Sequence, residues 1–159
     1  MKTQDKRYLS EKFRFLYDVS VIAVFLFISL SNVTFAAQRL AVSASDANIR
    51  SGPGTNYDII WKVNKYYPIK VIKKEGAWIR FVDFEGDEGW IYSSLVRNIP
   101  SVITIKEDCN IRSGPGTNYG IVFKAEKGVA FKIINRKNSW IHVQHADGDK
   151  GWIYKTLVW

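Results

Sequence analysis

The chain has few of the residues from which reactive centres are built, with one cysteine and two histidines in 159 residues. The single thiol, Cys109, excludes an intramolecular disulfide, so the fold must be stabilised by packing alone. It stands either as a small buried residue or as a reactive thiol. His142 and His145 lie far from it in sequence, and no set of cysteines and histidines has the spacing of a zinc site or of a nucleophile with its base. We therefore expect no metal, no cofactor and no enzymatic activity.

What the sequence does contain is a duplication. The ten residues Asn-Ile-Arg-Ser-Gly-Pro-Gly-Thr-Asn-Tyr occur at 48–57 and again at 110–119, and a shift of 62 positions keeps both copies in register to the C-terminus. This period is longer than most solenoid repeats and fits two small domains in tandem. We place the first domain at 38–98 and the second at 99–159. The potentially reactive residues belong to one copy only, because Cys109, His142 and His145 align with Ala47, Arg80 and Asp83.

Both copies have the pattern of β structure. Each has a Gly-Pro-Gly turn, a β-branched run (59–61 and 121–123), a Trp-Ile pair (78–79 and 140–141), and a hairpin turn followed by Trp-Ile-Tyr-x-x-Leu-Val (90–96 and 152–158). Apolar residues alternate between closely spaced turn signals, and no helical period runs through the repeats. We therefore predict an all-β fold.

The first 36 residues are of a different kind. Basic residues precede an apolar run from Val19 to Leu30 that only Ser20 and Ser29 interrupt. This pattern is typical of a signal peptide, with cleavage after Ala36. The alternative is an uncleaved anchor helix, because the uncharged stretch is about long enough to cross a bilayer. In either case we expect the repeats outside the cytoplasm, periplasmic or secreted, with membrane contact only if the segment is retained.

The repeated motif resembles that of the bacterial SH3 (SH3b) domain family. Asn-x-Arg-x-Gly-Pro-Gly-x-x-Tyr is followed about twenty residues later by an isolated tryptophan, Trp78 or Trp140, and then by Gly-x-x-Gly-Trp-Ile. The resemblance extends over essentially all of the chain beyond the leader and is satisfied twice. It implies two tandem, strongly bent SH3-like β barrels, each with a long loop after its first strand and a 3₁₀ turn at 93–95 or 155–157.

The Gly-Pro-Gly turns are structural candidates in both copies. Proline fixes one φ, while a glycine on either side can take the positive φ that a tight reversal needs. We therefore expect alanine at these glycines to cost stability. The turn residues are Gly52, Pro53 and Gly54 in the first copy and Gly114, Pro115 and Gly116 in the second.

The strands that begin at Trp78 and Trp140 supply a candidate ligand groove. Alternation sends Ile79 and Phe81 to one face and Trp78 to the other, with the same arrangement in 140–144. The residues beside the tryptophan are polar in the second copy, so both tryptophans are expected at the surface or in a shallow groove, where aromatics commonly make contacts. The candidate ligand-binding residues are Trp78, Arg80, Tyr92 and Tyr57 in the first copy and Trp140, His142, Tyr154 and Tyr119 in the second.

Several shared residues have structural interpretations beside the functional ones. Tyr57 and Tyr119 could support their loop instead of touching a ligand, and Trp90 and Trp152 fit core wedges more readily than contact residues. Arg50 and Arg112 could bind a carboxylate through two N–H groups, or each could tie its own turn to nearby carbonyls.

The formal net charge is +8, and from Cys109 onward eight basic residues stand against three acidic ones. Such a surplus serves solubility, or it attracts polyanions outside the cell. No nucleic-acid recognition motif is visible, so nucleic acid is not an expected partner. The resemblance implies a non-enzymatic binding protein of the bacterial cell envelope that docks on peptidoglycan or wall-linked peptides. The alternative is an envelope protein–protein interaction or scaffolding module that uses the basic second repeat.

Overall fold

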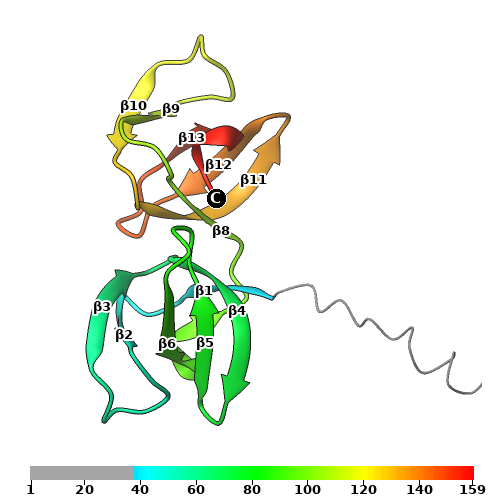
Figure 1. The fold of residues 1–159 in the computed structure, drawn as a ribbon. Coiled ribbons are helices and arrows are strands. Elements are labelled where there is room, and N and C mark those ends of the chain that lie inside the picture. Colours follow the sequence, from blue (N-terminus) through cyan, green and yellow to red (C-terminus); the bar gives the residue numbers. More distant parts are fainter. Residues whose placement is uncertain (1–37) are drawn as a thin grey trace, which may run out of the picture. The chain divides into compact units, whose positions relative to one another are not determined.

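The computed structural model describes residues 38–159, and their regular elements are strands and two short 3₁₀ turns (Figure 1). The first copy contains β1 (Arg39–Val42), β2 (Asp46–Arg50), β3 (Ile59–Asn64), β4 (Pro68–Glu75), β5 (Trp78–Val82), β6 (Glu88–Tyr92), η1 (Ser93–Leu95) and β7 (Val96–Arg97). The second contains β8 (Ser101–Ile103), β9 (Cys109–Arg112), β10 (Ile121–Ala125), β11 (Ala130–Lys137), β12 (Trp140–Gln144), β13 (Lys150–Tyr154) and η2 (Lys155–Leu157). The predicted all-β fold and both 3₁₀ turns are confirmed.

The leader falls outside this description. The signal peptide or anchor expected at 1–36 lies outside the described residues, and the domain boundaries at 38–98 and 99–159 stay predictions. Within residues 38–159, no helix combines the length and the hydropathy needed to span a bilayer.

Each copy forms its own antiparallel sheet. The strand order is β3-β2-β6-β5-β4-β1-β7 in the first copy and β10-β9-β13-β12-β11-β8 in the second. Apart from β7, the two orders are the same strand for strand, and in Figure 1 each group of arrows curves around its own interior. The duplication read from the sequence is therefore a duplication of topology, and the structure consists of two tandem small barrels.

A bulge in the longest strand bends each sheet. The pairing register shifts between Val71 and Lys73 where β4 meets β5, and between Ile133 and Asn135 where β11 meets β12. A bulge bends its strand and increases the local twist. The bent strand can therefore pair with β1 or β8 at one end and with β5 or β12 at the other, which curls the sheet around the core.

Each barrel has a separate hydrophobic core. Alternation correctly predicted the inward side chains of the central strand, since Ile79 and Phe81 are buried, as are Ile141 and Val143. These residues pack against apolar side chains from the neighbouring strands of the same copy. With no disulfide among the described residues, this packing carries the stability of each barrel.

The two cores fill the same space with different residues. In the first copy the fully buried phenylalanine is Phe81 on β5, and β4 supplies the fully buried Ile69. In the second copy the phenylalanine is Phe131 on β11, and β12 supplies Val143. Because Phe131 stands where the first copy has Ile69, the large side chain has moved to the adjacent strand. Such paired changes conserve volume, which a close-packed core requires.

The Gly-Pro-Gly turns depend on close approach and not on a positive φ. Among residues 38–159, the glycines with positive φ are Gly76, Gly86, Gly128 and Gly148. The expectation of a positive φ at the glycines beside Pro53 and Pro115 is therefore wrong. A Cβ on Gly52 would instead overlap the ring of Tyr57. A Cβ on Gly114 would overlap Tyr119 in the same way.

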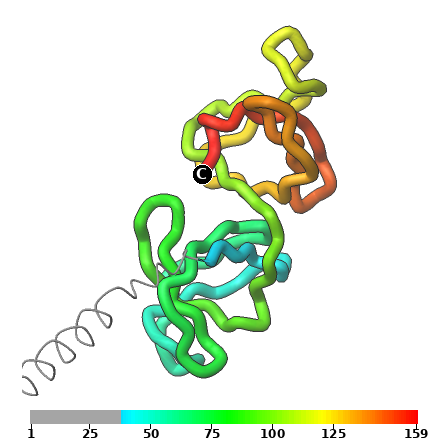
Figure 2. Tube along the Cα trace, turned by 90° about the vertical axis from the view of Figure 1, so that its right-hand side faces the viewer, coloured from blue at the N-terminus to red at the C-terminus, as the bar shows by residue number. Residues whose placement is uncertain are grey.

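This contact supports a loop that has few other neighbours. In Figure 2 the yellow loop between β9 and β10 extends away from the rest of its barrel, and Figure 1 shows the same from another side. Within it, Tyr119 N–H donates to Gly116 O at 3.4 Å, and Gly116 N–H donates to Gly114 O at 3.0 Å. The glycines of these turns are therefore explained by contact with a tyrosine ring and not, as expected from the sequence, by a positive φ.

Candidate functional site

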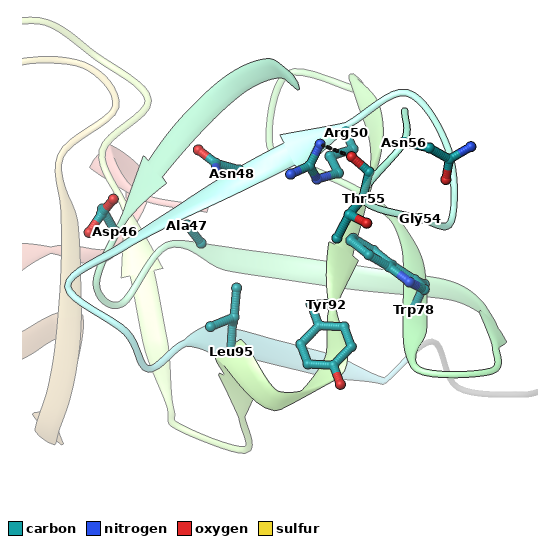
Figure 3. A pocket seen from close by; sticks show the side chains of 10 residues that line it. All are labelled: Asp46, Ala47, Asn48, Arg50, Gly54, Thr55, Asn56, Trp78, Tyr92 and Leu95. Carbon is teal, nitrogen blue, oxygen red and sulfur yellow. Dashed lines mark hydrogen bonds between the residues drawn. The ribbon is translucent and has the colours of Figure 1, made fainter. Parts of the chain in front are cut away.

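The long loop after β2 forms one wall of a groove in the first barrel. This groove, which we call groove 1, has a volume of about 630 Å³. Its lining includes Asn48 and Arg50 from β2, Thr55 from the loop, Trp78 from β5, Tyr92 from β6 and Leu95 from η1 (Figure 3). Five short segments of one copy thus converge on a single concave surface.

An equivalent groove occurs in the second barrel. Groove 2 has a volume of about 560 Å³, and its lining includes Asn110, Arg112, Thr117, Trp140, Tyr154 and Leu157. Each of these residues stands 62 positions after its counterpart in groove 1. The duplication has therefore preserved the lining of the groove as well as the fold.

An edge-to-face aromatic pair forms part of each groove. The ring centroids of Trp78 and Tyr92 are 5.4 Å apart with an interplanar angle of 66°, and those of Trp140 and Tyr154 are 5.3 Å apart at 69°. The two members of each pair are directly opposite across adjacent strands, so they share the face that points away from the core. The expectation that both tryptophans lie in a shallow groove is consistent with this half-buried position.

The arginine on β2 holds the loop and also lines the groove. Arg50 Nη1 donates to the carbonyl oxygens of Thr55 at 3.0 Å and Tyr57 at 2.7 Å. Arg112 Nη1 donates to Tyr119 O at 2.8 Å. Nη1 of each arginine therefore ties its own turn to nearby carbonyls, which is the structural interpretation. Their Nε and Nη2 groups have no protein acceptor among residues 38–159 and can donate to a ligand.

Asn48 and Asn110 each bury an amide oxygen that has no hydrogen-bond partner. Among the described residues, these two Oδ1 atoms are the buried side-chain oxygens or nitrogens left without one. An unpaired buried acceptor costs about 1–3 kcal/mol. The same unpaired oxygen occurs at the same position of both copies, and because it has almost no exposed area, a ligand in the groove does not reach it without a rearrangement of the side chain.

The sequence analysis missed this asparagine as a site residue, although a signal for it was present. In β2, Ala47 and Ile49 are buried in the core, so alternation sends Asn48 and Arg50 to the groove side. The ten-residue motif that begins at Asn48 predicts a turn, and the motif alone does not show that its first residue lies on a strand and points outward.

Four of the eight candidate ligand-binding residues lie outside the groove linings. Tyr57 and Tyr119 pack on their turn glycines, which is the loop-supporting interpretation. Arg80 donates Nε to Glu88 Oε2 at 2.9 Å, and His142 stacks on Trp152 with a centroid distance of 4.8 Å and an interplanar angle of 11°. The grooves bring together Trp78 with Tyr92, and Trp140 with Tyr154, but not these four.

The histidine position also has a perturbed pKa. Partial burial, and next the nearby charge of Lys150, lower the pKa of His142 below its usual range. The neutral ring is thereby favoured on the face that also carries Trp140.

Trp90 is buried and Trp152 is half-buried, but both lie outside the two core clusters. Their neighbours Ile91 and Ile153 occupy the core, so each tryptophan points to the outer face of the sheet. Trp90 is directly opposite Arg80, and Lys73 Nζ lies 5.1 Å from its ring centroid. The tryptophan is covered by long side chains of the outer face and is not part of the core cluster.

Cys109 occupies the position of a small buried residue. It is 2% exposed, and its thiol donates to Lys106 O at 3.1 Å. Burial raises the pKa of this thiol. Within residues 38–159, no three side chains of His, Cys, Asp or Glu gather into a group that could hold a metal ion.

Comparison with known protein families gives two matches along the chain. A family model described as the bacterial SH3 domain matches residues 43–98 and again residues 106–159. The two matches together cover more than half of the sequence and follow the two barrels.

Similar proteins include enzymes of the cell wall that are much longer. The chain is 27% identical over 161 residues to the putative N-acetylmuramoyl-L-alanine amidase YrvJ of Bacillus subtilis, covering 94% of this chain and 31% of that protein. Over 52 residues it is 50% identical to the probable cell wall amidase LytH of Staphylococcus epidermidis, covering 32% of this chain and 18% of that protein. The chain thus spans less than a third of the length of these relatives. Among solved structures, an NlpC/P60 family protein from Bacillus cereus aligns at a TM-score of 0.38 and 13% identity, over 77% of this chain and 56% of that one.

Proposed function

Because the chain belongs to the bacterial SH3 domain family, we propose that it is a non-enzymatic binding protein of the bacterial cell envelope that docks on peptidoglycan or wall-linked peptides through grooves 1 and 2. The observation that carries the proposal is the repetition of one groove in two barrels. Each groove has the same aromatic pair, the same arginine and the same unpartnered amide oxygen. The core changed residues between the copies, whereas the groove lining kept them.

The chemistry of the grooves suits an extended peptide. The outer N–H groups of Arg50 can donate to a carbonyl or carboxylate, and the Trp78–Tyr92 pair offers apolar area to a small side chain. An extended peptide presents carbonyls and side chains in alternation. Pockets of this kind take ligands through a few polar groups placed on a largely apolar surface.

The named relatives support the location. LytH is described as a probable cell wall amidase and YrvJ as a putative N-acetylmuramoyl-L-alanine amidase, and the residues of this chain that match YrvJ include its SH3 segments. We propose the same surroundings for this chain, periplasmic or secreted, with the export signal at residues 1–36. Two linked modules would bind a polymeric wall with greater avidity than either alone.

A pull-down with insoluble sacculi tests the proposal. The wild-type protein should sediment with sacculi at low salt, and Trp78→Ala combined with Trp140→Ala should remain in the supernatant. Each single variant should retain weaker binding through its intact groove. The matched control is Ile60→Ala with Val122→Ala, which truncates one exposed apolar side chain per copy outside the grooves and should sediment like wild type. Wild-type protein left in the supernatant would show that wall binding is wrong.

The absence of catalysis is tested separately. We expect purified peptidoglycan to release no soluble muropeptides when it is incubated with the protein. Release of such fragments at a rate above that of a heat-inactivated sample would assign an enzymatic role.

The alternative function is an envelope interaction module that docks on an acidic protein through the second barrel. The surplus of basic residues after Cys109 favours it. Crosslinking in cells separates the two functions, because this alternative gives a discrete protein adduct while wall binding gives material that sediments with sacculi.

A further inference from the structure

The outer face beside groove 1 carries two ion pairs. Their four side chains, on β4, β5 and β6, are Lys73, Glu75, Arg80 and Glu88. Lys73 Nζ lies 2.9 Å from Glu75 Oε2, and Arg80 donates Nε to Glu88 at 2.9 Å. The remaining charge on this face, Lys70 opposite Val82, does not distinguish the copies, because the second copy has Lys132 at the same position.

The same four positions beside groove 2 carry no acidic residue. They are Asn135, Lys137, His142 and Lys150, which stand 62 residues after their counterparts. Both ion pairs are lost, and two lysines remain without an acidic partner among the described residues. The lowered pKa of His142, caused partly by Lys150, agrees with this uncompensated positive field.

One of these lysines borders the aromatic pair of groove 2. Lys137 is directly opposite Trp140 across β11 and β12, and Trp140 is directly opposite Tyr154. The three side chains therefore project from the same face. In groove 1 the position of Lys137 is taken by Glu75, opposite Trp78. The aromatic pair is the same in both grooves, but the charge next to it is reversed.

A second lysine follows the aromatic pair in groove 2. Lys155 comes directly after Tyr154, and its N–H donates to Ser139 O at 2.9 Å. The first copy has Ser93 at this position, with the same bond to Ala77 O. In addition, Arg112 Nη1 is bonded to one loop carbonyl where Arg50 Nη1 is bonded to two. Groove 2 thus has more positive charge and one more available N–H.

We infer that the two grooves differ in charge selectivity, and that groove 2 is the one that prefers a carboxylate. The planar guanidinium of Arg112 can hold a carboxylate through two parallel hydrogen bonds, and Lys137 and Lys155 add attraction at short range. Groove 1 accepts the same peptide without a charge requirement, because Glu75 stands beside its aromatic pair where groove 2 has Lys137. The inference rests on the proposed function in taking wall peptides as the source of the carboxylate.

A soluble probe tests the selectivity without the wall. The indole N–H signals of Trp78 and Trp140, assigned from their phenylalanine variants, are followed by NMR at low ionic strength. The probes are N-acetyl-Ala-Ala, its C-terminal amide, and glycerol phosphate. We expect the Trp140 signal to respond to the carboxylate at a concentration about two- to fivefold lower than to the amide, the size expected for exposed charge pairs, with no such preference at Trp78. Equal response to carboxylate and amide at Trp140, no response at Trp140, or tighter binding of the phosphate would overturn the inference.

Neighbouring residues on β11 provide a matched pair of variants. Lys137→Glu should abolish the carboxylate preference of groove 2. Arg136→Glu changes the net charge equally, but it lies opposite Ile141 and so on the other face, and it should largely keep the preference. The reciprocal Glu75→Lys should give groove 1 a carboxylate preference. All three side chains are exposed, so folding should be retained. Equal losses from Lys137→Glu and Arg136→Glu would show a non-specific charge effect and contradict the inference.

Sacculi then distinguish this inference from the proposed function. The Trp78→Ala protein, which keeps groove 2, should bind less to sacculi whose carboxylates have been converted to amides, and it should bind equally after wall phosphate polymers are removed with hydrofluoric acid. The Trp140→Ala protein should not respond to either treatment. Sedimentation that is indifferent to amidation would refute the selectivity while leaving wall binding intact. A carboxylate-selective NMR response without sedimentation would support the selectivity and refute the wall as the target.

Discussion

The contact between Gly52 and Tyr57 makes a quantitative prediction for the stability of the first barrel. A Cβ at position 52 would lie well inside van der Waals contact with three ring carbons of Tyr57, including Cγ, where the ring joins its own Cβ. The ring cannot relieve this overlap by moving only its far end. The backbone at Tyr57 is also held, because its carbonyl accepts from Arg50 at 2.7 Å and Ser51 N–H donates to Asp58 O at 3.0 Å.

Gly52→Ala should therefore destabilise the barrel by about 1–3 kcal/mol, the usual cost of forcing atoms into a packed site. For a domain near 60 residues each kcal/mol lowers Tm by about 4–8 °C, so the expected decrease is roughly 4–20 °C. Gly54→Ala should cost less, because its close neighbour is the flexible end of Asn56 and the Tyr57 ring is 3.3 Å away.

Scanning calorimetry of the purified variants measures the effect. The control is Gly120→Ala, since a Cβ there meets no atom within 4 Å and the first copy has Asp58 at that position. We expect Gly120→Ala to change the free energy of unfolding by less than about 0.5 kcal/mol. Adding Tyr57→Ala completes a double-mutant cycle. If Gly52→Ala costs as much in the Tyr57→Ala background as in wild type, the ring contact is not the reason for the glycine.

Three further predictions concern single side chains. Tyr66 has a φ of 72° where the second copy has Gly128, so Tyr66→Gly should raise the free energy of unfolding in urea by about 1 kcal/mol. Burial, and then the hydrogen bond that Tyr67 donates to Asp83 at 2.7 Å, raise the pKa of Tyr67 above its unfolded value. The resulting contribution to stability is complete below about pH 10 and is lost as the pH rises. Tyr67→Phe should therefore reduce the decline, between pH 9 and 11, in the free energy of unfolding measured in urea. Burial raises the pKa of the Cys109 thiol and shields it, so iodoacetamide at pH 8 should leave the native protein unmodified and alkylate the unfolded chain.

Much of the fold could be predicted because the chain contains two copies of one domain, and the pattern in each copy can be checked against the other. The shift of 62 positions aligned strands whose inward pairs, such as Ile79 with Phe81, proved to be buried. The resemblance to the bacterial SH3 family also placed both 3₁₀ turns correctly. A position that is apolar in one copy and polar in the other does not lie in the core. Val82 and Gln144 form such a pair on the face that carries Trp78 and Trp140, so this comparison predicted both tryptophans near the surface.

The errors came from features that residue types do not define. A glycine can serve a positive φ or a close contact, and only coordinates show that Gly52 serves the second. Trp90 was expected in the core because it is large and apolar; it is buried, yet the two-residue period places it on the face opposite Ile91 and outside the core cluster. The predicted groove lining was incomplete because Asn48 is both the first residue of the turn motif and an outward residue of β2, and the motif alone does not show its strand position.

The differences between the copies separate what the fold requires from what a ligand requires. In the core, the exchange of Ile69 and Phe81 for Phe131 and Val143 nearly conserves volume, with a net difference of one methylene group, because packing penalises large changes. On the outer face no such compensation occurs, and replacing Glu75 by Lys137 leaves the charge unbalanced. The stability of the fold does not require this imbalance of charge, because exposed charges contribute little to stability. The groove lining is identical while the charge beside it differs, and this combination is what a shared ligand backbone with different end groups would produce.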